Sequence, residues 1–114
     1  MSVKLTTRQV GDVTVVDAAG RITLGDGAST FRDTIRDLST AGQKKLLLNL
    51  AEVSYIDSSG IGELVSGFTT VTNQGGQVKL LNLTKRVQDL LQITKLYTVF
   101  EVYEDEATAV RSYT

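Results

Sequence analysis

The residues of this chain with the clearest chemical potential form the short run Asp57-Ser58-Ser59-Gly60. A carboxylate and two hydroxyls follow an apolar stretch and precede a segment of helical periodicity, so this run is predicted to lie where a strand turns into a helix. Asp57, Ser58 and Ser59 can each cap the first helical turn. Unbonded backbone N–H groups and the positive end of the helix dipole favour a negative group at such a corner.

A serine hydroxyl at this corner is a good phosphate acceptor, because strand-to-helix turns run over the surface. A phosphoryl group adds about −1.5 to −2 charges near neutral pH, beside the carboxylate of Asp57. The helix end partly accommodates this charge, whereas a partner surface complementary to the neutral corner does not. The run therefore predicts a binding switch set by phosphorylation of Ser58 or Ser59, which spacing alone does not separate. The alternative is that it serves only as a cap and a turn.

Several familiar kinds of enzymatic site are excluded by residue type. The chain has no His and no Cys, so the usual zinc sites, thiol nucleophiles and Ser-His pairs cannot form. Val65 stands where a dinucleotide fingerprint beginning at Gly60 needs its third glycine, and there is no Gly-Lys-Ser/Thr phosphate loop. Ile56 stands where a nucleophile elbow needs its first glycine. We expect a protein that is not an enzyme and has no metal or cofactor of its own.

The composition is that of an average globular protein. With 114 residues, 41% of them hydrophobic and 22% charged, and a net charge of −1, the chain is expected to fold and not to bind nucleic acid. The basic pairs Lys44-Lys45 and Lys85-Arg86 are interpreted as solvated surface. Neither a signal peptide nor an apolar run of about 18 residues is present, so we expect a cytoplasmic location without membrane insertion.

The elements that position the corner follow from turn residues and periodicity. Gly11-Asp12 separates two β-branched runs and predicts an antiparallel hairpin, and the apolar run 46–50 predicts a strand buried on both faces. The expected elements are strands over residues 3–9 and 13–16, a helix from the 20–30 loop to near Gly42, a strand over 46–50, a helix from Ser58 to about Asn73, a strand over 78–81, a short helix after Thr84, a strand over 99–103 and a helix over 105–112.

This succession predicts an α/β fold. Strands and helices alternate after an opening hairpin, in the order β-β-α-β-α-β-α-β-α, so a mainly parallel mixed sheet covered by helices is expected, in one domain over residues 1–114. The apolar residues of the segment 90–97 are assigned mostly to the core; exposure of some of them is the alternative, and it would favour self-association.

Three segments of the chain resemble the STAS domain of anti-sigma-factor antagonists. They are Leu48-Asn49-Leu50, Tyr55-Ile56-Asp57-Ser58-Ser59-Gly60-Ile61-Gly62 and Gly75-Gly76-Gln77-Val78-Lys79-Leu80. The resemblance covers essentially the whole chain, including the order of its elements. The Asp-Ser-Ser-Gly-Ile-Gly block is typical of the phosphorylatable members of the family.

This resemblance implies partner switching. In the family, the unmodified protein binds an ATP-dependent serine kinase that is also an anti-sigma factor, and thereby frees the sigma factor. The kinase inactivates the antagonist by phosphorylating the serine directly after the Asp, and a phosphatase reverses the modification. The acceptor is then Ser58, with Ser59 as the competing candidate, and ATP and Mg²⁺ belong to the kinase. The expected partner-binding residues are Thr23, Asp26, Asp57, Ser58, Ser59, Gly60 and Ile61.

One position departs from the family pattern. Members often carry an acidic residue at about the position of Thr23, where it helps to contact the kinase. Either Asp26 takes this role or the partner differs from the usual anti-sigma factor. The alternatives are a subunit of a stress-signalling scaffold of STAS domains that sequesters a serine kinase, and a cytoplasmic accessory subunit of a transporter.

Overall fold

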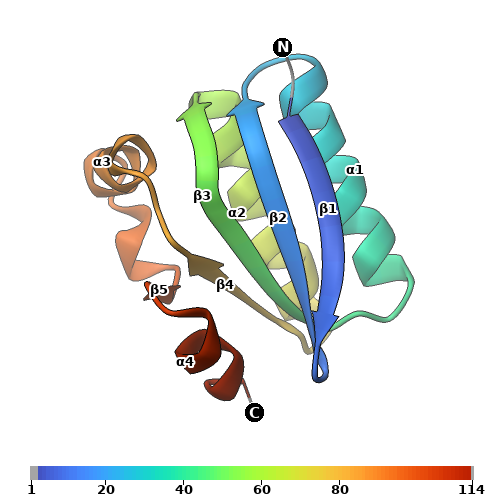
Figure 1. The fold of residues 1–114 in the computed structure, drawn as a ribbon. Helices are drawn as coiled ribbons and strands as arrows, with labels where there is room; N and C mark the ends of the chain where they lie inside the picture. The colour runs from blue at the N-terminus through green and yellow to red at the C-terminus, as the bar shows by residue number, and fades with distance from the viewer. Residues whose placement is uncertain (1–2, 114) are drawn as a thin grey trace.

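The computed structural model describes residues 3–113, so residues 1, 2 and 114 of the expected domain lie outside it (Figure 1). Its elements are β1 (Val3–Val10), β2 (Val13–Ile22), α1 (Asp26–Thr40), β3 (Lys45–Ile56), α2 (Ser58–Asn73), β4 (Gln77–Leu81), α3 (Lys85–Ile93), a 3₁₀ turn (Leu96–Thr98), β5 (Val102–Tyr103) and α4 (Glu106–Arg111). The predicted α/β class and the predicted order of strands and helices are confirmed.

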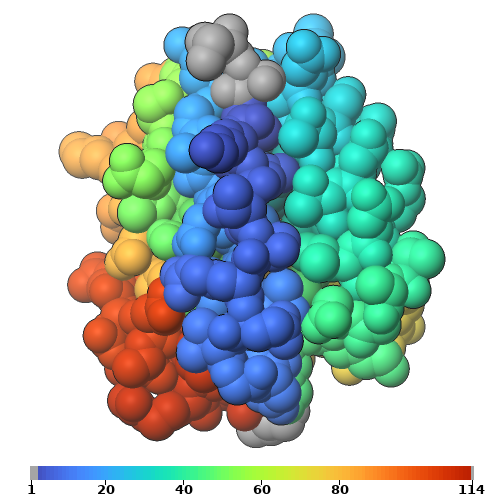
Figure 2. All heavy atoms as spheres, turned by 45° about the vertical axis from the view of Figure 1, so that its right-hand side comes forward, coloured from blue at the N-terminus to red at the C-terminus, as the bar shows by residue number. Residues whose placement is uncertain are grey.

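The five strands form one mixed sheet in the order β1-β2-β3-β4-β5. β1 and β2 form the predicted antiparallel hairpin, and its turn uses Gly11 at φ 63°, a left-handed conformation that suits glycine. The other three pairings are parallel. β1 is therefore an edge strand, and it lies at the surface between the α1 and α4 segments (Figure 2).

The sheet carries a core on each face. α1 and α2 lie behind it in Figure 1 and cover the larger core, whereas α4 packs on the opposite face against Val13, Val15 and Leu47. Leu46, Leu47 and Leu48 are successive residues of β3 and are all buried, which confirms a strand buried on both faces. α4 covers only part of its face, so the carboxyl ends of β2 and β3 remain open on that side (Figure 1).

β3 is longer than its neighbour β4. β4 pairs only with residues 45–49 of β3, and β3 then continues alone beside β2 as far as Ile56. The β2–β3 register shifts twice in this half, between Asp17 and Ala19 and between Gly20 and Arg21. Such bulges re-aim the strand end, and here that end leads directly into Asp57.

The predicted start of the last strand is wrong. The last strand covers only Val102–Tyr103, because Val99 has helical angles and its N–H donates to the carbonyl of Leu96 at the end of the 3₁₀ turn. The apolar residues of the 90–97 segment are mostly core, as expected: Leu91 is buried, and Leu90 and Leu96 pack against the larger core, whereas Ile93 and Tyr97 are 77% and 54% exposed. Lys95, in the left-handed region at φ 62°, follows the C-cap of α3, where the helix ends.

Candidate functional site

Asp57 ties together the two loops that form the predicted corner. It is the N-cap of α2, and its Oδ1 accepts a hydrogen bond from the backbone N–H of Gly60 at 2.9 Å. Its Oδ2 accepts from the backbone N–H of Leu24 at 3.0 Å, in the loop between β2 and α1. One side chain thus closes the first turn of α2 and holds the neighbouring loop against it.

These backbone donors hold the pKa of the Asp57 carboxyl below its usual range, with the Leu24 N–H contributing most and that of Gly60 next. Hydrogen bonds from N–H groups stabilise the ionised form of a carboxyl group. The corner therefore carries a negative charge at neutral pH before any modification. Both carboxylate oxygens are already engaged by the backbone.

Two glycines let both helix starts approach the end of β2. A Cβ atom at residue 60 would overlap the carbonyl oxygen of Ile22 and lie 2.6 Å from Cγ1 of Ile56. A Cβ atom at residue 27 would likewise overlap the carbonyl oxygen of Arg21. Gly60 and Gly27 are thus required where α2 and α1 begin, since backbone cannot give way to a side chain at such distances.

The two candidate acceptor hydroxyls differ in exposure. Ser58 is the first residue of α2 and its side chain is exposed, whereas Ser59 is half-buried. Within residues 3–113, the Ser58 hydroxyl has no hydrogen-bond partner. Asp57 alone performs the capping that the sequence left open among three residues, so Ser58 is not needed for the cap.

The other predicted binding residues differ in exposure. Asp26 is exposed at the start of α1, and Thr23 is half-buried with its carbonyl accepting from the N–H of Ala28 at 2.8 Å. Gly60 and Ile61 are buried, so any contribution they make to binding is through the position of the helix.

Leu24 was not predicted by the sequence. Its side chain is 79% exposed beside the corner, although its N–H is bonded to Asp57. The neighbouring Gly residues give only a weak indication in the sequence that Leu24 is exposed. Its position beside the corner is seen only in the structure, from the hydrogen bond between its N–H and Asp57.

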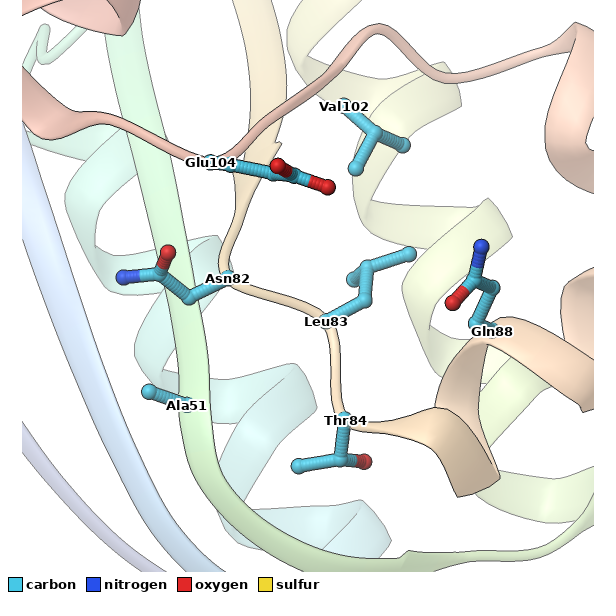
Figure 3. Close-up of a pocket in the computed structure, with 7 residues that line it drawn as sticks. All are labelled: Ala51, Asn82, Leu83, Thr84, Gln88, Val102 and Glu104. Carbon is cyan, nitrogen blue, oxygen red and sulfur yellow. The ribbon is translucent and has the colours of Figure 1, made fainter.

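A separate cavity of about 420 Å³ opens where β4 ends and β3 continues alone (Figure 3). It is lined by Ala51, Asn82, Leu83, Thr84, Gln88, Val102 and Glu104, and none of the predicted site residues is among them. Residues 3–113 contain no group of three or more acidic side chains arranged to hold a metal ion. None of the helices they form combines the length and apolarity needed to cross a bilayer.

Replacing Asp57 tests the coupling of the two loops. Asp57→Ala leaves two backbone donors without their acceptor, and we expect it to lower the free energy of unfolding by about 1–2 kcal/mol. Asp57→Asn keeps a capping oxygen, so its loss should be smaller. Urea unfolding at pH 7 measures both variants; equal stability of Asp57→Ala and the wild type would contradict the coupling.

The stabilising effect of Asp57 is also expected to depend on pH. The folded-state pKa of Asp57 is lowered, so the stability contributed by its charge is fully present above the unfolded value of about 3.9 and is lost as pH falls through the folded value. The difference in unfolding free energy between wild type and Asp57→Asn should therefore shrink below about pH 4. A difference that stays constant from pH 7 to pH 3 would contradict it.

Comparison with known proteins identifies the family. The model of the STAS domain matches residues 4–109. The anti-sigma-B factor antagonist of Bacillus subtilis (strain 168) is 33% identical over 102 residues, which cover 90% of this chain and 92% of that relative.

Solved structures share the fold. A candidate anti-sigma factor antagonist from Thermotoga maritima matches with a TM-score of 0.89 at 23% identity, covering 96% of this chain and 93% of that one. The phosphorylated form of the Bacillus protein SpoIIAA matches with a TM-score of 0.75 at 19% identity, covering 95% and 97%. The sheet order, the capped corner and the match over residues 4–109 lead to one conclusion: this chain belongs to the STAS domain family.

Proposed function

We propose that this chain is an anti-sigma-factor antagonist that binds an anti-sigma factor with serine kinase activity, and that phosphorylation of Ser58 ends the binding. The observation that carries the proposal is the exposed side chain of Ser58, next to the ionised carboxylate of Asp57. A kinase needs a reachable hydroxyl, and modification of this one breaks no hydrogen bond among residues 3–113. The name of the B. subtilis relative, an anti-sigma-B factor antagonist, supports this function over a scaffold or transporter subunit.

Exposure favours Ser58 over Ser59 as the acceptor. Ser59 is half-buried in the first turn of α2, whereas Ser58 is exposed, so a kinase reaches Ser58 more easily. SpoIIAA, which shares the fold, is known in an unphosphorylated and a phosphorylated form, which fits a family in which modification leaves the fold standing.

Charge provides the mechanism of release. The N–H of Gly60 is already bonded to Asp57, so the helix end has less capacity to absorb a second anion. Phosphorylation changes the net charge of the chain from −1 to about −3 and places the addition beside Asp57. A partner surface that fits a neutral hydroxyl then faces a strongly negative group, and like-charge or desolvation penalties of several kcal/mol dissociate the complex.

In this mechanism the partner and this chain have different roles. The partner supplies ATP, Mg²⁺ and the catalytic groups, and a serine phosphatase restores the hydroxyl. This chain contributes the acceptor and a binding surface that includes the exposed Leu24, whose loop is bonded to Asp57, and the neighbouring residues Thr23 and Asp26. Such a protein acts in the cytoplasm by binding, without an activity of its own.

Phosphate mapping tests the proposal. The chain is incubated with the anti-sigma-factor kinase of its own genome and Mg·ATP, and the modified residue is located by mass spectrometry. We expect phosphate on Ser58, its loss in Ser58→Ala and its retention in Ser59→Ala. Phosphate on Ser59 alone would contradict the site, and absence from both with a kinase shown to be active would contradict the switch.

A further inference from the structure

Two arginines and a tyrosine gather on the open face of the sheet, at the carboxyl ends of β2 and β3. Arg21 and Tyr55 are register partners on these strands, and Arg86 reaches the same ring from the first turn of α3. The guanidinium carbons lie 4.9 Å (Arg21) and 4.3 Å (Arg86) from the Tyr55 ring centroid. Three elements therefore converge on one aromatic ring.

Both guanidinium groups lack a carboxylate partner among residues 3–113. The contrast with other arginines is clear: Arg8 bonds Asp17 and Glu106 at 2.6 Å each, and Arg36 bonds Asp33 at 2.9 Å. Lys85, the neighbour of Arg86, is paired with Asp89. In the described part of the chain, their charged groups are held by contact with the ring of Tyr55.

This arrangement brings like charges together. Because both guanidiniums lie close to one centroid, they are separated by no more than about 10 Å, the Debye length at 0.1 M salt, so their repulsion is only partly screened. Neither guanidinium group donates a hydrogen bond within residues 3–113, so their N–H donors remain available for oxygen ligands. An anion that contacts both groups would relieve the repulsion and satisfy these donors.

We propose that Arg21 and Arg86, positioned by the ring of Tyr55, form a binding site for a dianionic phosphoryl group. Two guanidinium forks match the charge and the oxygen geometry of such a group, since arginine bonds phosphate in bidentate fashion. Tyr55 is a positioning residue whose flat ring restrains two otherwise mobile side chains. The site is independent of the proposed switch at Ser58, because its occupation requires neither the kinase nor the modification.

The test is an NMR titration of the unmodified chain with inorganic phosphate at constant ionic strength, following the Nε–Hε signals of the arginines. We expect saturable shifts of Arg21 and Arg86 while Arg36 stays unmoved. Acetate, a monoanion, should bind at least about tenfold more weakly. Absence of saturable shifts, or equal binding of acetate and phosphate, would overturn the proposal. A phosphoserine peptide as a second probe distinguishes a free phosphate compound from a phosphorylated protein as the source of the group.

Variants distinguish phosphate binding at this site from a general effect of net charge. Arg21→Gln and Arg86→Gln should each weaken phosphate binding by about tenfold, whereas Arg36→Gln, which removes an equal charge from a paired arginine, should leave it unchanged. Tyr55→Leu should weaken binding with both arginines present, and Tyr55→Phe should restore it. Equal weakening by all three Gln variants would show only a net-charge effect and would refute the site.

Discussion

Ser58→Asp is expected to lower the affinity for the anti-sigma-factor partner by about 100-fold, and Ser58→Ala by less than about threefold. The aspartate places a second negative charge beside Asp57, where the proposed partner surface would meet a neutral hydroxyl in the unmodified protein. The alanine removes only a hydroxyl that forms no hydrogen bond within residues 3–113. Titration calorimetry with the purified partner measures both affinities.

The added charge of Ser58→Asp is not expected to lower the stability of the fold. A carboxylate in the first turn of a helix interacts favourably with the helix dipole, so thermal unfolding of Ser58→Asp should match that of the wild type. The repulsion should also weaken as salt rises, because Ser58 is exposed. If Ser58→Asp bound the partner as tightly as Ser58→Ala, release by charge would be wrong even if Ser58 were phosphorylated.

Gly60→Ala is expected to destabilise the chain by about 3 kcal/mol, a large effect for one methyl group. The new Cβ would overlap the carbonyl oxygen of Ile22 and press on Ile56. Relief requires the start of α2 to move away from β2, which stretches the Asp57 hydrogen bonds. Thermal unfolding should show a midpoint lowered by roughly 12 °C.

Gly62 offers a matched control in the same helix. A Cβ atom there would meet nothing within 4 Å, and alanine is the better helix former by about 0.5–1 kcal/mol. Gly62→Ala should therefore raise the melting temperature while Gly60→Ala lowers it. Destabilisation of similar size in both variants would contradict a contact specific to Gly60.

The sequence predicted the corner well because its signals are local. A polar cap, two serines and a following apolar helical period lie within a few residues of one another, and Asp57 is found as the cap. The tight contact at Gly60 could not be predicted, since it depends on the carbonyl of Ile22, which a parallel pairing with two register shifts brings near. The link between Leu24 and Asp57 was hidden for the same reason.

The error in the start of the last strand has a different origin. Residues 99–103 are rich in β-favouring types, but the left-handed Lys95 starts a 3₁₀ turn that carries Val99 in helical geometry. β4 then accepts only two residues of pairing. The geometry of the preceding turn therefore outweighs the intrinsic β preference of Val99.

The bond between Asp57 and the loop at Leu24 also bears on how such a switch can diversify. The donor is the backbone N–H of residue 24, which every amino acid except proline supplies. Side chains at positions 23, 24 and 26 can therefore change without loosening the cap, whereas Gly25, at φ 98°, is constrained and an insertion or deletion would move the donor out of reach. Related proteins can in this way exchange partners by substitution in a loop of constant length, while the proposed phosphoacceptor corner stays the same.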